Sequence, residues 1–174
     1  MFERYTEKAR GVIFLARFET SRFGTAEIET EHVLLGLLSQ DKALLDRLLG
    51  TAVDVAPIAA RISDRTPMGE EGQLFADVPL PVDLESLLQQ IRDQSSAGEK
   101  IPVARDVALS TECKRVLMFT AEEANQLDHK HIDTEHLLLG LLLEHGCFAA
   151  EILRGLGFSL EKVREDLAKR SNET

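Results

Sequence analysis

Apolar residues recur at helical spacing in two stretches of the chain that lie 104 residues apart. Within residues 9–16 they stand at i, i+3, i+4 and i+7, and residues 113–120 repeat this spacing, with a threonine at the last position. Such spacing places the side chains on one face of a helix. Thr6 and Ser110 precede the two stretches at matching positions, where a side-chain oxygen can accept hydrogen bonds from the first backbone N–H groups. The pattern therefore predicts two equivalent amphipathic helices with Thr6 and Ser110 as N-caps.

A nearly identical string of eleven residues follows each of these helices. The first copy begins at Ile28 and reads Ile-Glu-Thr-Glu-His-Val-Leu-Leu-Gly-Leu-Leu, and nine of its eleven positions are identical in the second copy. The leucines predict a second helix in each unit. Thr30 and Thr134 are predicted as its N-caps, with Glu31 and Glu135 in the first turn, where the helix dipole favours a negative charge.

Each string also contains a glycine, Gly36 or Gly140, although glycine lowers helix propensity by about 1 kcal/mol relative to alanine. Its presence in both copies indicates that another backbone packs closely against that turn. Two further helices are predicted in each copy, and the last of them begins after Asp54 in the first copy and after Ser159 in the second. Each copy is therefore expected to hold four helices.

The sequence thus predicts an all-α fold made of two pseudo-repeats with four helices each. We expect a single domain, residues 1–174, in which repeat one spans 2–62, a linker spans 63–105 and repeat two spans 106–170. The linker has no counterpart within the repeats, and its leucines predict an extra short helix at 84–91. This helix is interpreted either as cover for part of the core or as a docking element for a partner.

Composition narrows the classes of function. The formal net charge is −10 and the pI is near 5.0, which argues against a nucleic-acid partner and against anionic membrane surfaces. No apolar run reaches the length of a membrane span, and the first residues lack the layout of a signal peptide, so we expect no membrane association and a cytoplasmic location. Cys113 and Cys147 correspond to Ala9 and Ala43, which indicates small packed positions rather than a disulfide or a metal site.

Three motifs together resemble the amino-terminal domain of Clp ATPases, of the ClpC/ClpA type. They are the opening Arg4-Tyr-Thr-Glu-Lys-Ala9, the two Thr-Glu-His-x-Leu-Leu-Gly-Leu-Leu strings, and Gly146-Cys-Phe-Ala-Ala-Glu-Ile-Leu153. The resemblance covers residues 2–62 and 106–168. It implies a double Clp-N fold that is non-catalytic and binds proteins: adaptors, substrates, or Clp ATPase and protease subunits. The sequence contains no G-x-x-x-x-G-K-[ST] phosphate loop, so a stand-alone accessory protein and the amino-terminal domain cut from a full-length Clp ATPase both remain open.

The same resemblance implies a ligand chemistry, because the motif glutamates of ClpC-type domains bind phosphoarginine. Glu31 and Glu135 would hold the guanidinium and nearby helix N-termini would hold the phosphate. However, Glu29 and Asp133 place a second carboxylate in each site, which should repel phosphate and favour an unmodified cationic group or a basic partner surface. Alternatively, the motif glutamates only stabilise their helix starts. The candidate partner- or ligand-binding residues are Glu31, Glu135, Thr30, Thr134, Thr6 and Ser110.

The histidines give no pattern typical of an enzyme. His32 and His136 are interpreted as packed side chains whose ring nitrogens bond to the backbone, and His129 and His131 as exposed turn residues. Zinc-protease spacings and G-x-S-x-G contexts are absent, so we expect no enzyme, no cofactor and no metal. The rival hypotheses are a metal-dependent hydrolase that uses His32, His136 and the motif glutamates, and a small-ligand sensor of the phosphoarginine type.

Overall fold

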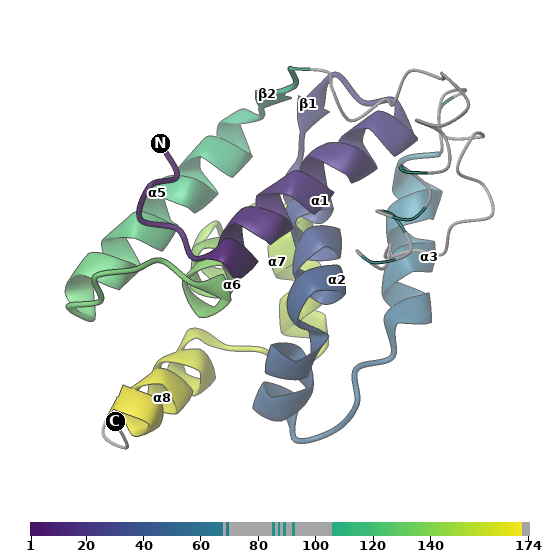
Figure 1. Cartoon of the computed structure of the whole chain (residues 1–174). Coiled ribbons are helices and arrows are strands. Elements are labelled where there is room, and N and C mark those ends of the chain that lie inside the picture. Colours follow the sequence, from purple (N-terminus) through teal and green to yellow (C-terminus); the bar gives the residue numbers. More distant parts are fainter. Residues whose placement is uncertain are drawn as a thin grey trace.

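The computed structural model describes residues 1–67 and 106–171, with isolated positions between them at 69, 85, 87, 89 and 92. Within these residues the fold is helical, with two very short strands (Figure 1). The short helix predicted at 84–91 lies outside the continuously described residues. The elements run in the order α1 (Glu7–Phe23), β1 (Glu27–Ile28), α2 (Thr30–Leu49), α3 (Val55–Arg65), β2 (Ala108–Leu109), α5 (Thr111–Gln126), α6 (Thr134–Leu143), α7 (Phe148–Gly155) and α8 (Leu160–Ser171).

The all-α double repeat predicted from the sequence is confirmed, with one difference between its halves. In repeat two, α6 and α7 are separate helices. In repeat one the matching pair runs on as α2, which is interrupted at Asp41, where φ is −146° and ψ is 53°. The predicted second and third helices of repeat one are both present, and a kink at Asp41 joins them where a short loop separates α6 from α7 in repeat two.

Each repeat is centred on a close helix pair, α1 with α2 and α5 with α6. A Cβ added to Gly36 would lie 2.4 Å from the Val12 carbonyl oxygen, and one added to Gly140 would lie 2.5 Å from the Val116 carbonyl oxygen. Both distances are far below van der Waals contact, so only glycine permits this approach of the backbones. The predicted close packing at the two glycines is confirmed.

The two repeats share one core and are joined along their extended segments. β1 and β2 pair in parallel, and Tyr5 forms a bridge with Ile132, so that each repeat contributes a segment to both pairings. In Figure 1 the β1–β2 pair lies at one end of α1, while the amino terminus runs past α5. Buried apolar side chains from both repeats belong to a single cluster. The position of each motif helix is thus fixed by the other repeat as well as by its own.

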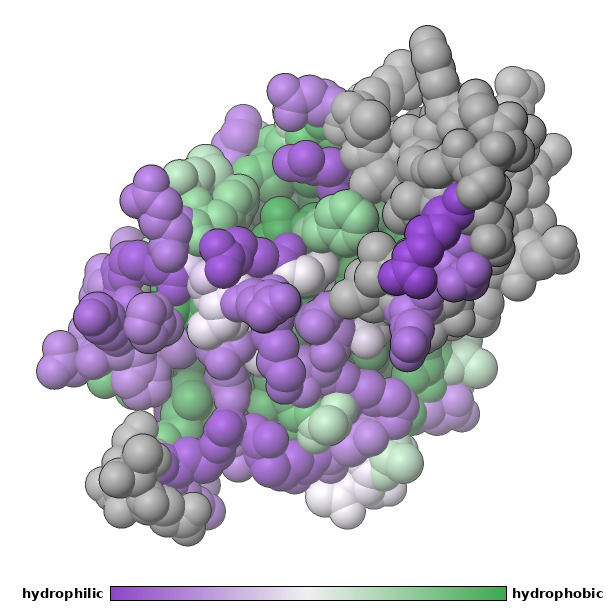
Figure 2. Space-filling model, in the orientation of Figure 1, coloured by the Kyte–Doolittle hydropathy of each residue, from purple (hydrophilic) through white to green (hydrophobic). Residues whose placement is uncertain are grey.

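Hydrophilic side chains cover much of the face shown in Figure 2, with apolar surface exposed over α5. A groove of about 450 Å³ lies where the amino-terminal segment meets α5, and Met1, Leu117 and Met118 line it. Among the described residues, no single helix is both long and apolar enough to cross a membrane. α6 and α7 satisfy the length and composition only as a pair bent by 102°.

Candidate functional site

The motif helices begin with a capping arrangement that corrects the prediction for Thr30 and Thr134. Each threonine is the first helical residue, and the N-caps are the preceding acids, Glu29 and Asp133. The Asp133 carboxylate accepts a hydrogen bond from the Thr134 N–H at 2.8 Å. The prediction was wrong because a carboxylate one residue earlier can reach the free N–H groups of the first turn and carries the charge that the helix dipole favours.

The motif histidines complete this arrangement from the third helical position. Nδ1 of His32 accepts the Glu29 N–H, and Nδ1 of His136 accepts the Asp133 N–H, both at 2.9 Å. They therefore do what glutamate or glutamine does in a capping box. Burial lowers the pKa of His32 to about 4, and burial together with the neighbouring His129 lowers the pKa of His136. The prediction of packed, backbone-bonded histidines is confirmed.

His129 differs from its prediction as an exposed turn residue. It is half-buried, and its Nδ1 lies 2.8 Å from Nε2 of His136. The preceding Asp128 has a φ of 56°, a left-handed conformation that aspartate tolerates better than most residues and that turns the chain back toward α6. His131 is exposed, as predicted.

Hydroxyl groups link each motif to the opposite repeat. Thr6 and Ser110 cap α1 and α5, as predicted, each through a hydrogen bond of 3.2 Å. Beyond capping, the Thr6 hydroxyl donates to the Asp133 carboxylate at 2.8 Å, and the Ser110 hydroxyl bonds to the Glu29 carboxylate. The six candidate residues therefore form two groups, each with the cap residue of one repeat beside the motif of the other. Site one contains Thr30, Glu31 and Ser110; site two contains Thr134, Glu135 and Thr6.

The motif threonines also reach across the molecule, to two different partners. The Thr134 hydroxyl donates to Asp41 at 2.7 Å, at the break in α2. The Thr30 hydroxyl bonds to the thiol of Cys147, which caps α7. These hydroxyls therefore connect the motif helices to the junction between the second and third helices of the opposite repeat.

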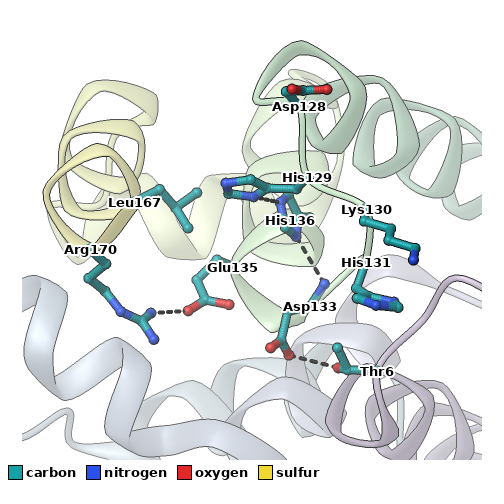
Figure 3. A pocket seen from close by; sticks show the side chains of 10 residues that line it. All are labelled: Thr6, Asp128, His129, Lys130, His131, Asp133, Glu135, His136, Leu167 and Arg170. Atoms are coloured by element: carbon teal, nitrogen blue, oxygen red, sulfur yellow. Dashed lines mark hydrogen bonds and ion pairs between the residues drawn. The ribbon is translucent and has the colours of Figure 1, made fainter. Parts of the chain in front are cut away.

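Glu31 and Glu135 are both buried in the first turn of their helices. In site one, the Thr30 hydroxyl lies 3.3 Å from Glu31 Oε2. In site two, Glu135 forms an ion pair with Arg170 of α8, and Arg47 of α2 lies 3.8 Å away. Figure 3 shows the Arg170 guanidinium pointing at the Glu135 carboxylate across the gap between α8 and α6.

A cavity of about 640 Å³ adjoins site two and is bordered by groups of both charges. Asp133 and Glu135 lie at the start of α6, and Lys130 and His131 come from the loop before it (Figure 3). In site one, burial raises the pKa of Glu29, and the hydroxyl of Ser110 partly offsets this effect. In site two a guanidinium already lies against the Glu135 carboxylate, and in both sites the N-cap of the motif helix is an acidic residue of the chain itself.

Both thiols lie in buried positions in the part of the chain described. Burial raises the pKa of Cys113 to about 12 and also raises the pKa of Cys147, so both thiols stay protonated at neutral pH. The two cysteines are free and buried. No group of three His, Cys, Asp or Glu side chains among the described residues is arranged to hold a metal ion.

The sequence patterns did not indicate Arg170, Asp41 and Arg47 as site residues. Arg170 could have been found, because the fourth helices align at an offset of 105 residues and Arg170 matches Arg65 there. Asp41 and Arg47 gave no such signal, because their partners Thr134 and Glu135 lie in the opposite repeat.

Both repeats of the chain have similar sequences among known proteins. The Clp repeat (R) N-terminal domain family matches the chain at residues 4–90 and again at 108–174. The chain is 33% identical over 176 residues to the negative regulator of genetic competence ClpC/MecB of Bacillus subtilis (strain 168), and 35% identical over 180 residues to an ATP-dependent Clp protease ATP-binding subunit ClpA homolog of Guillardia theta. Each alignment covers all of this chain but only 18% of the relative.

A solved structure shares the fold. The N-terminal domain of the caseinolytic protease associated chaperone ClpD from Arabidopsis thaliana superposes with a TM-score of 0.65 at 21% identity, covering 99% of this chain and 97% of that one. Each repeat therefore has a family match of its own, and the first match continues to residue 90, into the segment predicted as a linker. The chain belongs to the Clp repeat N-terminal domain family.

Proposed function

We propose that this chain is a non-catalytic protein-interaction module of a Clp protease or chaperone system, which binds adaptors, substrates or Clp subunits. The observation that carries the proposal is the arrangement of the two motif glutamates. Glu31 and Glu135 each lie buried in the first turn of a motif helix, whose acidic N-cap bonds to the cap residue of the opposite repeat. Such carboxylates are held in place for a partner without the loss of side-chain entropy that a mobile carboxylate would suffer on binding.

The ligand chemistry that suits these sites is a cationic side chain of a protein partner. A phosphoryl group would need the free N–H groups of a helix start, where the acidic N-caps Glu29 and Asp133 already stand. We therefore expect phosphoarginine to give little or no thermal stabilisation. A clear thermal shift that is lost in the combined Glu31→Ala and Glu135→Ala variant would contradict this part of the proposal.

The partner is identified by capture from a native cell extract. The wild-type chain should retain Clp ATPase subunits, protease subunits or adaptors, and the combined Glu31→Gln and Glu135→Gln variant should retain far less of the same proteins. The matched control replaces two exposed glutamates, Glu122→Gln with Glu165→Gln, and removes the same charge away from both sites. Equal capture by all three chains would contradict the proposed role of the motif glutamates.

The chain spans 18% of the length of the two relatives described above. The proposed module is compatible both with an accessory chain that brings partners to a separate Clp ATPase and with the amino-terminal domain of a longer Clp ATPase. The length of the source open reading frame distinguishes the two.

The rival from the enzyme class, a metal-dependent hydrolase, is tested by metal analysis of the purified protein. Nδ1 of His32 accepts a backbone N–H, and its ring is fully buried, so we expect no stoichiometric metal. Stoichiometric zinc that disappears in a His32→Ala variant would replace the proposed function with the rival.

A further inference from the structure

Site two already contains a guanidinium that belongs to the chain itself. Arg170 lies in the last turn of α8 and pairs with Glu135, whose side chain is only 9% exposed. The Arg170 side chain is 51% exposed, so it reaches the carboxylate from the solvent side of the site. Leu167, one turn earlier on α8, borders the same cavity (Figure 3). The end of α8 thus stands where an incoming side chain would approach Glu135.

The other charges of site two are also satisfied from within the chain. The Asp133 carboxylate accepts from the Thr134 N–H and from the Thr6 hydroxyl, both at 2.8 Å. Arg47 lies 3.8 Å from Glu135 but pairs more closely with Asp166, at 3.0 Å. The nearest cation to Glu135 among the described residues is therefore the guanidinium of Arg170, the more exposed of the two arginines.

The counterpart of Arg170 in repeat one behaves differently. Arg65, at the matching position of α3, places its guanidinium carbon 4.3 Å from the centre of the Phe148 ring. This distance is typical of a cation–π contact. Within the described part of the chain, Arg65 makes no ion pair with Glu31. The same residue type at the same position thus covers the motif glutamate in one repeat and an aromatic ring in the other.

We infer that Arg170 is a built-in occupant of site two, so that a cationic partner group binds Glu135 only after the end of α8 has released it. This inference rests on the proposed function, because it describes how one of the two partner sites is regulated. Since the pair is partly exposed, its free energy is small and a partner can displace Arg170 without unfolding the domain. Arg65 does not occupy site one in this way, so among the described residues a built-in guanidinium is a feature of site two.

The test compares the wild type with Arg170→Gln in an NMR titration with N-acetyl-arginine amide, followed at the backbone amides of residues 134–137. Removal of the competing guanidinium should tighten binding at these amides by roughly two- to fivefold, the range expected from a partly exposed ion pair. Arg65→Gln is the matched control, because it removes the same charge at the equivalent position and should leave binding at site two unchanged. Adding Glu135→Gln to Arg170→Gln should abolish the gain.

Three results would overturn the inference. Binding at site two that is no tighter in Arg170→Gln than in the wild type, including no detectable binding in either, shows that Arg170 does not compete for Glu135. An equal gain in Arg65→Gln shows a general effect of net charge. A gain that survives Glu135→Gln places the binding elsewhere. Capture of Clp proteins is measured separately, so failure of the proposed function and failure of this inference are distinguishable.

Discussion

The two repeats are nearly the same in packing and clearly different in charge. Both keep the glycine against which a neighbouring backbone packs, and both keep the histidine that closes the cap of the motif helix. At matching surface positions the charges diverge. Arg47 in repeat one corresponds to Glu151 in repeat two, and Arg61 corresponds to Asp166. The ion pairs between the repeats join Arg47 to Asp166 and Arg61 to Glu151, so the arginine lies in repeat one in both of them.

This difference follows from what each kind of contact tolerates. At Gly36 and Gly140 a carbonyl oxygen lies 2.4–2.5 Å from where a Cβ would stand, so no residue other than glycine fits. An exposed ion pair contributes little to the free energy of folding, so it can be exchanged or lost. The shared frame, meaning the glycine contacts and histidine caps that hold the motif helices, is therefore the same in both repeats. The charged residues around the motif glutamates can differ between the repeats. Site two contains an arginine of α8, and site one does not have its counterpart.

The largest expected effect tests the shared frame. Gly36→Ala and Gly140→Ala should each lower the free energy of unfolding by about 3 kcal/mol, because the new methyl group overlaps a backbone carbonyl that cannot move alone. Urea denaturation measures both. Gly155→Ala is the control, since nothing lies within 4 Å of its added Cβ, and it should be neutral or slightly stabilising. Near-wild-type stability of either motif variant would contradict the equivalence of the two frames.

The next effect is a dependence of stability on pH. Burial lowers the pKa of His32 in the folded state to about 4, from 6.5, so the folded state resists protonation more than the unfolded chain does. The contribution of neutral His32 to the free energy of unfolding is therefore fully present above pH 6.5. It decreases as the pH falls towards 4, by about 3 kcal/mol in total. The measurement is the free energy of unfolding against pH for the wild type and for His32→Gln.

The His32→Gln variant should lose this part of the pH dependence, because glutamine can accept the Glu29 N–H without a titrating group. His136→Gln should show a change of the same sign, since burial also lowers the pKa of His136. A His32→Gln profile parallel to the wild type between pH 6.5 and 4 would show that His32 is not held neutral by burial.

A smaller effect tests the cap residues that face the opposite repeat. Thr6→Ala and Ser110→Ala should each cost about 1–2 kcal/mol, because each hydroxyl caps a helix and bonds to an acid of the other repeat. Thermal or urea unfolding gives the values. Thr111→Ala removes an exposed hydroxyl one residue beyond Ser110 and should be close to neutral. If Thr6→Ala and Ser110→Ala lower the free energy of unfolding no more than Thr111→Ala does, the two caps do not stabilise the fold.

The sequence could predict the features that repeat and could not predict those that join the repeats. Helical spacing located the helices, and glycine at two matching positions identified the close backbone contacts. The N-caps of the motif helices were misplaced by one residue, because threonine and the preceding acid are both good N-caps and spacing does not choose between them. His129 was misjudged because the left-handed turn at Asp128 is a tertiary feature without a local signal.

The candidate site was predicted only in part for the same reason. The two glutamates were evident from the duplicated string, and Thr6 and Ser110 from their position before a helix. That Thr6 and Ser110 bond to an acid of the opposite repeat depends on how the two repeats pack together. The ion pair of Arg170 with Glu135 joins α8 to α6 within repeat two, and the match of Arg170 to Arg65 does not indicate it, because Arg65 makes a different contact.

The most direct test of the account is a pair of double-mutant cycles, measured by urea unfolding. One cycle combines Glu135→Gln with Arg170→Gln, and the other combines Glu31→Gln with Arg65→Gln. The account predicts a coupling free energy of about 0.5–1 kcal/mol for the first pair and none beyond experimental error for the second. Equal couplings, or a coupling confined to Glu31 and Arg65, would contradict the claim that one shared frame holds two differently occupied sites.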